Sequence, residues 1–280
     1  MTENNPKTIL ITGCSSGIGY DAAHQLHKLK WRVFATCRKP EDCERLMSEG
    51  LESFVLDYED EESIKTAVAE TLHRSDGSLD ALFNNGAYAV PGFTQDLPRN
   101  ALRAIFEANL FGYFDLINQL LPVMLKQGHG KIINCSSVLG LAALRGRGAY
   151  NATKFAMEGL TDTLRLELIK QPVDIILIEP GPIKTNIRQN GQVQFEKWLD
   201  WENSLARKFY EKQLMPRLYD KNQSPDKWEL PASAVTDKLI MALNSSNPKP
   251  RYYVTTPTYI IGFLKRILPT RALDKLLSRI

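Results

Sequence analysis

The stretch TILITGCSSGIG, residues 8–19, decides the fold of this 280-residue chain. Its first five residues are apolar or β-branched, which predicts a buried strand. Glycines follow at positions 13, 17 and 19, and residues 20–30 then show helical periodicity. Glycines between a strand and a helix let the backbone approach a pyrophosphate, whose charge is met by amides at the helix N-terminus. The spacing G-x-x-x-G-x-G differs from the common G-x-G-x-x-G fingerprint, and an ordinary glycine-rich turn is the alternative.

Strands and helices alternate along the rest of the chain, without repeats. We expect further strands at residues 32–37, 53–57, 79–84, 131–135 and 173–179, and long helices at residues 100–126 and 149–170. Such alternation predicts an α/β fold, a doubly wound parallel sheet of the Rossmann type with about seven strands and helices on both faces. One domain would span residues 1–280, with ligands at the carboxyl ends of the strands.

Three polar residues in the middle of the chain have a spacing that suits proton transfer. Tyr150 and Lys154 lie four residues apart on a predicted helix and so share one face, and Ser137 lies thirteen residues upstream of the tyrosine. A phenol has a pKa of about 10, so a nearby cation must stabilise the phenolate before it exchanges protons near neutral pH. Alone, such a pair also occurs on helices by chance.

Six motifs occur in this order along the chain: TGCSSGIG, NNGA at residues 84–87, the asparagine of EANLFG, Ser137, YNATK and PGPIKT at residues 180–185. Together they resemble the single-domain short-chain dehydrogenase/reductase family, over roughly residues 7–185. Within that family the chain looks most like the 17β-hydroxysteroid and retinol dehydrogenases. It is also similar to bacterial NADP-dependent aldehyde reductases.

The resemblance implies a catalytic set of Ser137, Tyr150, Lys154 and Asn109. In the reductive direction, hydride would pass from the nicotinamide to a carbonyl carbon while Tyr150 protonates the oxygen and Ser137 donates a hydrogen bond to it. Lys154 would lower the pKa of Tyr150 and hold the nicotinamide ribose. Asn109 would support a water-linked proton relay to the lysine; alternatively, it is a polar residue that interrupts a helix.

The resemblance also assigns cofactor-binding residues. These are Gly13, Ser15, Ser16, Gly17, Ile18, Gly19, Arg38, Lys39, Asp57, Asn84, Gly86, Tyr150, Lys154, Pro180, Gly181, Ile183 and Thr185. The family order Asn-Asn-Ala-Gly is exchanged to NNGA here, and because glycine tolerates positive φ, we expect the turn at Gly86 to be redrawn by one residue. Asn85 would tie neighbouring strands together.

The end of the second predicted strand bears on the choice of cofactor. Folds that prefer NAD place an acidic residue there to bind the ribose hydroxyls, whereas this chain has Cys37, followed by Arg38 and Lys39. A guanidinium can pair with a 2′-phosphate, so we expect NADP(H). Alternatively, these cations decorate a solvated loop. Asp57, matched to the family position near the adenine, is a helix cap in the alternative interpretation.

The composition limits the class of protein. A net charge of +3 is too small to indicate a nucleic-acid partner, and 43% hydrophobic with 24% charged residues is typical of a globular protein. The cysteines at positions 14, 37, 43 and 135 have no metal-ligand spacing, so we expect no metal, reduced thiols and a cytoplasmic location. No apolar run reaches the roughly 18 residues that span a bilayer.

The resemblance implies that residues 186–231 fold over the substrate as a lid. Apolar side chains there favour a hydrophobic substrate, although core packing is the alternative for about half of them. They are Phe195, Trp198, Trp201, Phe209, Tyr210, Leu214, Met215 and Trp228.

The amphipathic tail, residues 257–280, places basic residues beside an apolar stretch. Such a segment lies against a membrane surface, the body of the protein or another subunit, and these alternatives stay open. By analogy with relatives, the long helices that bear Asn109 and Tyr150 would pair in a homodimer or homotetramer.

These observations predict an oxidoreductase that transfers hydride between NADP(H) and the carbonyl or alcohol of a hydrophobic substrate, an aldehyde, retinoid or steroid, in the reductive direction. One alternative is an NAD-dependent alcohol or hydroxysteroid dehydrogenase. Another is a catalytically idle NADP(H) sensor, against which the intact set of Ser137, Tyr150 and Lys154 argues.

Overall fold

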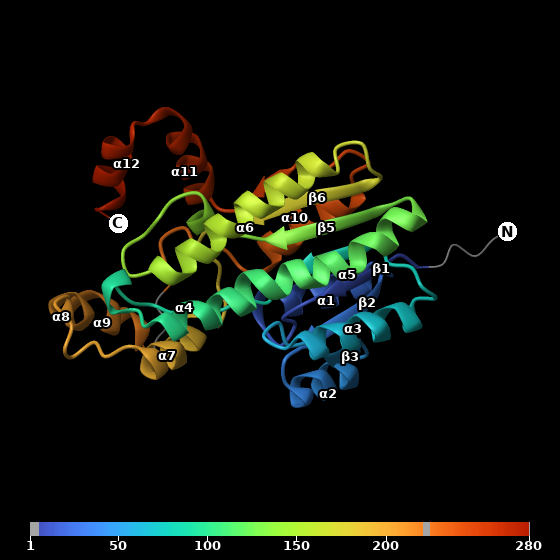
Figure 1. The fold of residues 1–280 in the computed structure, drawn as a ribbon, viewed down its shortest axis with the longest axis horizontal. Coiled ribbons are helices and arrows are strands. Elements are labelled where there is room, and N and C mark those ends of the chain that lie inside the picture. Colours follow the sequence, from blue (N-terminus) through green and yellow to red (C-terminus); the bar gives the residue numbers. More distant parts are fainter. Residues whose placement is uncertain (1–5, 221–224, 280) are drawn as a thin grey trace.

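Parallel strands form one sheet, in the order β3-β2-β1-β4-β5-β6-β7, within residues 6–220 and 225–279, which the computed structural model describes (Figure 1). Each strand predicted from the sequence is present, and the prediction of a doubly wound parallel sheet is confirmed. The strands are β1 (Thr8–Ile11), β2 (Arg32–Cys37), β3 (Glu52–Val55), β4 (Ala81–Asn84), β5 (Gly130–Cys135), β6 (Val173–Glu179) and β7 (Arg251–Tyr253). The sequence pattern does not locate β7, which has only three residues.

The order of the strands reverses at β1. This strand pairs with β2 on one side and with β4 on the other, so the chain crosses over β1 after β3. The loops that follow β1 and β4 therefore leave the sheet in opposite directions. In an open parallel sheet such a divergence forms a crevice that binds ligands, and here the glycine loop lies in it.

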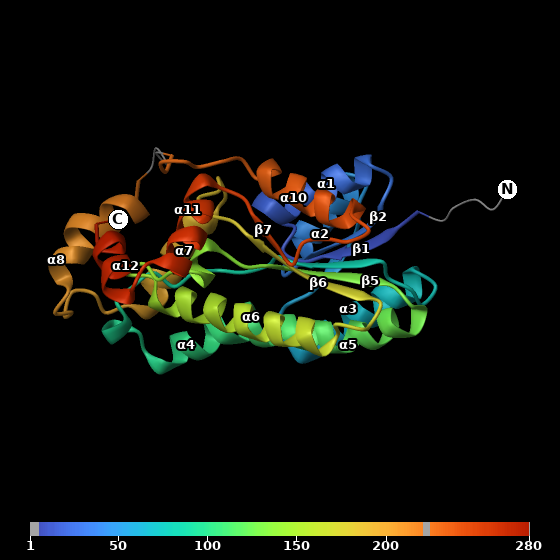
Figure 2. The same ribbon diagram turned by 90° about the horizontal axis from the view of Figure 1, so that it is seen from above.

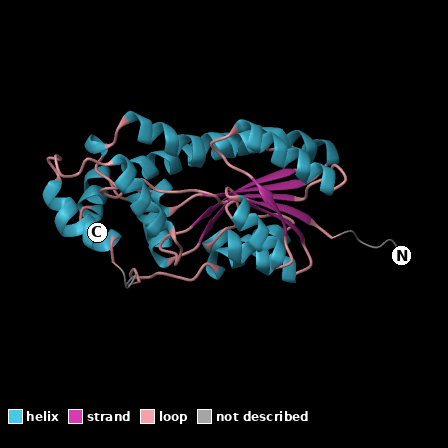
Figure 3. Ribbon diagram, turned by 90° about the horizontal axis from the view of Figure 1, so that it is seen from below, coloured by secondary structure: helices cyan, strands magenta, loops and turns pink. Residues whose placement is uncertain are grey.

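Two layers of helices cover the sheet (Figure 2; strands in Figure 3). One face carries α1 (Gly17–Lys28), α2 (Pro40–Ser48) and α10 (Ser233–Asn244), and the other carries α3 (Glu61–Arg74), α5 (Gly112–Gln127) and α6 (Gly148–Glu167). Side chains of β1 alternate between the layers, with Ile9 and Ile11 in the first core and Leu10 in the second. Burial on both faces explains the continuous apolar run of this strand.

The long helix predicted at residues 100–126 is interrupted. It consists of α4 (Arg99–Phe106), a π-helical turn at Glu107–Phe111 and α5. A π-helical turn holds one residue more than an α-helical turn and occurs frequently at functional sites. Asn109 lies at its centre.

The segment at residues 186–231 forms short helices beyond the carboxyl edge of the sheet (Figure 1). They are α7 (Ile187–Trp198), α8 (Arg207–Phe209), a π-helical turn at Tyr210–Leu214 and α9 (Met215–Leu218); residues 221–224 lie outside the described part. Phe195, Tyr210 and Leu214 are buried in one apolar cluster, against which Trp198, Trp201, Phe209 and Met215 pack, whereas Trp228 is exposed. Core packing thus accounts for more of these side chains than the expected half.

The tail forms α11 (Thr256–Ile267) and α12 (Thr270–Leu277). Ile261 of α11 packs on Leu141 and Ala142, so one face of the tail docks on the body of the protein. The other face exposes Tyr259, Ile260, Phe263 and Ile267, and contact of this face with a membrane or a subunit stays a prediction. Among the described residues, no helix is long and apolar enough to cross a bilayer.

A lysine fastens α10 to the sheet. Nζ of Lys131, in β5, donates to the carbonyl oxygens of Ala242, Leu243 and Ser245 at 2.9, 2.8 and 2.5 Å. The last carbonyls of a helix have no partner within the helix, and the helix dipole favours a cation beside them. Lys131 therefore caps α10 across the sheet.

Replacing Lys131 with methionine keeps the apolar stem and removes the cap. We expect Lys131→Met to lower the free energy of unfolding by about 1–3 kcal/mol, because buried carbonyls lose a charged donor. Urea unfolding followed by circular dichroism measures this. The exposed Lys170 is the control, since Lys170→Met should change stability by less than about 0.5 kcal/mol. Equal losses in the two variants would contradict the capping role.

Candidate active site

The glycine loop after β1 adopts a backbone conformation that other residues rarely adopt. Gly13 and Gly17 have φ values of 69° and 61°. A Cβ atom on Gly13 would lie 2.5 Å from Cα of Gly86, and one on Gly17 would lie 3.0 Å from the methyl group of Thr185. The loop therefore packs against the turns that follow β4 and β6. Within the described chain, N-cap Ser16 makes no side-chain capping hydrogen bond, so the first amides of α1 remain available for a pyrophosphate.

A cavity of about 420 Å³ opens beside this loop, at the carboxyl edge of the sheet. Its walls come from the loops after β1, β4, β5 and β6, from the start of α6 and from the lid. The predicted site residues that line it are Gly13, Ser15, Ser16, Gly17, Ile18, Gly86, Ser137, Tyr150, Lys154, Pro180, Gly181, Ile183 and Thr185. One cavity thus joins the glycine loop to the proton-transfer residues.

Ser137, Tyr150 and Lys154 meet on one wall of this cavity. The Ser137 hydroxyl accepts from the Leu139 amide at 3.1 Å and hydrogen-bonds to the phenol of Tyr150. Nζ of Lys154 lies 5.6 Å from the centre of the Tyr150 ring and donates to the carbonyl of Cys135 at 2.7 Å. The tyrosine and the lysine share one face of α6, as their spacing indicates.

Burial dominates the electrostatics of this wall. It raises the pKa of Tyr150 well above its ordinary value; the Cys135 thiol adds to the rise, and the hydrogen bond from Ser137 opposes it. Burial also lowers the pKa of Lys154 to about 8. The expected depression of the Tyr150 pKa by Lys154 stays a prediction, because burial is the largest influence on the phenol here. Tyr150 is therefore a protonated acid throughout the neutral pH range.

Asn109 lies behind the cavity wall and does not line it. Its Oδ1 accepts from the Tyr88 amide at 3.1 Å, and its Nδ2 donates to the Tyr88 carbonyl at 2.8 Å and to Oγ1 of Thr153 at 3.3 Å. The side chain thus holds the loop after β4 against α6. The water-linked relay through Asn109 stays a prediction.

Two predicted cofactor residues have structural positions instead. Asn84 is completely buried; its Oδ1 accepts from the Tyr58 hydroxyl at 2.6 Å and its Nδ2 donates to Oδ1 of Asn134 at 3.0 Å. The predicted contact between the Asn84 side chain and a cofactor does not fit this arrangement. Gly19 lies in the first turn of α1, where a Cβ atom would be 2.4 Å from the Gly13 carbonyl oxygen.

Three further predicted residues lie outside the cavity wall, beyond β2 and β3. Arg38 and Lys39 are exposed, and their contact with a cofactor stays a prediction. Asp57 accepts from the Glu59 amide at 3.1 Å, before the helix begins. Asp60 caps α3, because its side chain accepts from the amides of Glu62 and Ser63. The interpretation of Asp57 as the helix cap is therefore wrong.

The NNGA turn differs from its expected conformation. Gly86 does not adopt a positive φ, so the predicted reason for a redrawn turn is wrong. The turn instead needs a small residue at position 86, because Gly13 packs directly against it. Nδ2 of Asn85 donates to the carbonyl of Thr12 at 3.0 Å, which ties β4 to β1 as predicted.

Six charged residues that also line the cavity were not predicted from the sequence: Arg147, Lys184, Arg188, Arg217, Asp226 and Glu229. Arg147 could have been found by its position, one helical turn before Tyr150, and Lys184 by its place in the PGPIKT motif. The other four belong to the lid, whose sequence carries no signal for which side chains face inward.

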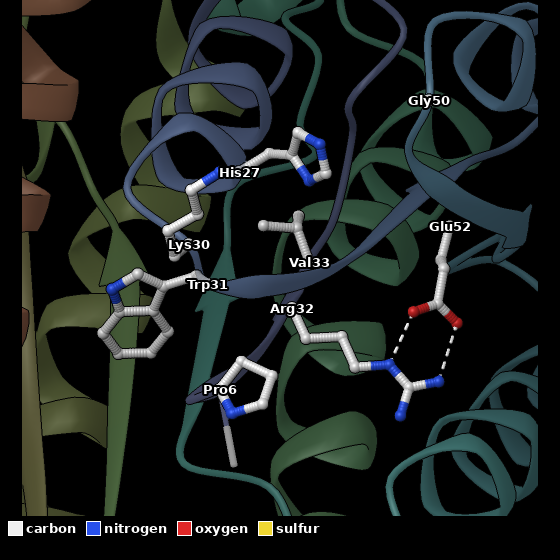
Figure 4. Close-up of a pocket in the computed structure, with 8 residues that line it drawn as sticks. All are labelled: Pro6, His27, Lys30, Trp31, Arg32, Val33, Gly50 and Glu52. Atoms are coloured by element: carbon white, nitrogen blue, oxygen red, sulfur yellow. Dashed lines mark hydrogen bonds and ion pairs between the residues drawn. The ribbon is translucent and has the colours of Figure 1, made fainter. Parts of the chain in front are cut away.

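A hollow of about 370 Å³ lies at the opposite, amino edge of the sheet (Figure 4). There Arg32 donates to both carboxylate oxygens of Glu52, at 2.6 and 3.1 Å, and to the Arg74 carbonyl. Its main charged pair is thus internally satisfied, and none of the predicted site residues lines it. The larger cavity is therefore the candidate active site.

A buried acidic cluster lies behind the site. Arg251 donates to Glu179 at 3.0 Å, to Glu158 at 2.9 Å and to Asp162 at 2.8 Å. Oε1 of Glu158 and Oε2 of Glu179 are buried without a hydrogen-bond partner among the described residues. Burial, then the charge of Glu158, raises the pKa of Glu179 far above its ordinary value. Glu179 therefore keeps its proton to a higher pH than an ordinary glutamate does.

Comparison with known proteins adds a family and relatives. The sequence pattern of the family described as short chain dehydrogenase matches residues 7–194. Oxidoreductase YbbO of Escherichia coli (strain K12) is 39% identical over 273 residues, which cover 97% of this chain and 94% of that protein. Retinol dehydrogenase 16 of Mus musculus is 31% identical over 279 residues, which cover 97% and 87% of the two chains.

Solved structures with the same fold hold different cofactors. A short chain dehydrogenase/reductase from Burkholderia phymatum in complex with NAD is 25% identical, with a TM-score of 0.78 and coverage of 99% of this chain and 97% of that one. An actinorhodin polyketide ketoreductase with NADPH is 24% identical, with a TM-score of 0.72 and coverage of 91% and 97%. The fold alone does not select between the two cofactors.

The raised pKa of Glu179 makes stability depend on pH. Because the pKa of Glu179 is raised in the folded protein, the folded state keeps a proton that the unfolded state releases above about pH 4.3. Stability from this group is complete at lower pH and is lost as pH rises toward the raised pKa. Glu179→Gln cannot lose this proton, so we expect the variant to lose less stability than the natural protein between about pH 5 and pH 9.

Urea midpoints across that pH range test this expectation. The control is Glu167→Gln, at an exposed position of α6, which should follow the natural protein. Parallel pH profiles for Glu179→Gln and the natural protein would contradict the raised pKa of Glu179.

Proposed function

The chain is an oxidoreductase of the short-chain dehydrogenase family, and on this basis we propose that it transfers hydride between NADP(H) and the carbonyl of a substrate with an apolar part, in the reductive direction. One observation carries the proposal. Ser137, Tyr150 and Lys154 line the same cavity as the glycine loop, so a dinucleotide held by that loop and a carbonyl held by the serine and the tyrosine would share one enclosed space.

The residues of the chain divide the chemistry among them. When bound, the cofactor supplies the hydride. Tyr150 donates the proton to the carbonyl oxygen, and Ser137 donates a hydrogen bond to the same oxygen as negative charge develops on it. Lys154 lies beside the tyrosine, where its ammonium stabilises the phenolate that forms when the proton leaves. The reductive direction requires Tyr150 to start the reaction protonated, as a phenol is at neutral pH.

The end of β2 supports NADP(H). Cys37 is buried and offers no carboxylate to the ribose hydroxyls, whereas Arg38 is exposed and forms no ion pair with the described residues. Its charge acts on Glu59 and Tyr88, in the loops after β3 and β4, so it lies at the edge where the adenosine half would bind. The Glu59 carboxylate nearby also keeps the NAD-dependent alternative open.

The apolar part of the substrate would meet a wall made of Ala89, Pro91, Leu139, Leu144 and Leu218. These residues lie in the same cavity as Tyr150, which supports an aldehyde, a retinoid or a steroid over a small polar sugar. The lid aromatics do not add to this wall, since they pack into the cluster described above.

Exposed apolar side chains support two proposed partners besides the substrate, a second copy of the chain and a membrane surface. Phe155, Leu160 and Leu166 expose apolar side chains on α6, which supports the packing of two copies through the long helices. The exposed face of α11, with Lys265 and Arg266 beside it, supports contact of the tail with a membrane surface.

Tyr150→Phe tests the function. Removal of the phenol proton donor should lower reduction of retinal, long-chain aldehydes or keto-steroids by about 100- to 10,000-fold, measured by loss of NADPH absorbance. Binding of NADPH, measured by fluorescence, should persist. Tyr113→Phe is the matched control, because the buried Tyr113 hydroxyl has no hydrogen-bond partner among the described residues. NADPH binding without reduction of any carbonyl by the natural protein would favour the sensor alternative.

Arg38→Met tests the choice of cofactor. Loss of a charged pair with the 2′-phosphate should lower kcat/KM for NADPH by about 10- to 100-fold and leave the value for NADH nearly unchanged. The exposed Arg271 gives the control variant Arg271→Met. A natural protein that uses NADH better than NADPH would overturn the proposed cofactor and retain the reaction.

A further inference from the structure

Arg147 occupies a position in the cavity that the proposed hydride transfer does not use. It immediately precedes α6 and lies three residues before Tyr150, so the two side chains leave neighbouring points of the chain. The backbone around it is fixed, because the Gly92 amide donates to the Gly146 carbonyl at 3.0 Å and the Asn151 amide donates to the Arg147 carbonyl at 2.8 Å. A rigid backbone thus presents this guanidinium to the cavity that holds Tyr150 and Ser137.

Most N–H donors of the Arg147 guanidinium have no hydrogen-bond partner among the described residues. Its hydrogen bond to the described residues is a long one of 3.4 Å, from Nη1 to the Gly146 carbonyl. No described carboxylate forms an ion pair with it, although a guanidinium carries five N–H donors. A charged group removed from water is costly unless it is paired.

The other charges around Arg147 do not neutralise it. The groups that act on it are Arg217, Asp226 and Arg188, all from the lid. Asp226 is already engaged, since it accepts from Arg217 at 2.5 Å and from Arg188 at 3.5 Å. The charged groups that act on Arg147 are therefore two guanidinium groups and one carboxylate that is already hydrogen-bonded. Burial, and then repulsion by Arg217, lower the pKa of Arg147 to about 10, which still leaves it charged at neutral pH.

We propose that Arg147 binds an anionic group of the substrate, so that the enzyme prefers carbonyl compounds that carry a carboxylate over uncharged ones. This inference rests on the proposed function, because it names the substrate class of the same site. The planar guanidinium suits a carboxylate, with which it forms two parallel hydrogen bonds. The apolar wall would hold the chain that joins the carboxylate to the carbonyl. The anion takes no part in the reaction, in which the carbonyl gains one hydride and one proton.

The site of the anion is distinct from the glycine loop. Arg147 extends from the junction of the loop after β5 with α6, whereas the free amides of α1 follow β1 and pack beside Thr185. We therefore expect a cofactor phosphate to bind the amides of α1 and to leave the Arg147 donors to the substrate. Loss of Arg147 should then affect the substrate and not the cofactor.

Matched pairs of aldehydes test the inference. The probes are succinic, adipic and azelaic semialdehydes, each compared with its methyl ester, at saturating NADPH. We expect kcat/KM of the natural protein to favour the acid in at least one pair by about 10- to 100-fold, and Arg147→Met to abolish this ratio. The KM for NADPH should be the same in both proteins.

Two further variants keep the test decisive. Arg145→Met removes a neighbouring exposed arginine whose guanidinium lies over Phe93 and Phe209, and it should keep the acid preference. Arg147→Lys keeps the charge but not the planar fork, so it should retain part of the preference if Arg147→Met fails to fold.

The outcomes separate this inference from the proposed function. Equal rates for acids and esters in the natural protein, an unchanged ratio in Arg147→Met, or a raised KM for NADPH in that variant would each overturn the anion site while hydride transfer stands. Failure to reduce any of these aldehydes, retinal or keto-steroids with either cofactor would overturn the proposed function itself.

Discussion

The contact between the turns after β1 and β4 is the constraint on which the site depends. Gly13 and Gly86 pack so closely that a side chain on Gly13 would overlap the Gly86 backbone. Thr12 reinforces this contact, because its Oγ1 accepts from the amides of Asn85 and Gly86 at 2.9 and 3.2 Å. The sheet changes direction at this point, so the two turns must separate above it. The cavity is the space that this divergence leaves, and it exists because the turns are clamped together at their base.

The other walls of the cavity are held in place by contacts with the same edge of the sheet. Asn109 holds the loop after β4 against α6, and the Cys135 carbonyl at the end of β5 binds the Lys154 ammonium. Contacts from the loop after β4 and from the end of β5 therefore position α6, the helix that carries Tyr150. Burial then sets the chemistry of these groups: it keeps the phenol protonated and brings the lysine pKa close to the physiological range.

The parts of this structure that follow a local rule could be predicted from the sequence. β1 and the glycine loop are contiguous, and Tyr150 and Lys154 lie on one helix, so their spacing carries their geometry. The failures concern relations between distant segments. Asn84 belongs to the family motif, but its side chain is hydrogen-bonded to Tyr58 and Asn134. Only the folded sheet brings these two residues next to it. The lid aromatics turned out to face the core, because apolar composition does not say which side of a short helix is covered.

The most direct test of hydride transfer is to trace deuterium from the cofactor and from the solvent into the product. NADPH that carries deuterium at both hydrogen positions of nicotinamide C4 should yield an alcohol with one deuterium on the former carbonyl carbon, as read by mass spectrometry of the product. In heavy water with ordinary NADPH, the same carbon should acquire none, since solvent hydrogen reaches only the oxygen, through Tyr150. Deuterium on the carbon from heavy water, or consumption of NADPH without formation of an alcohol, would contradict hydride transfer within this cavity.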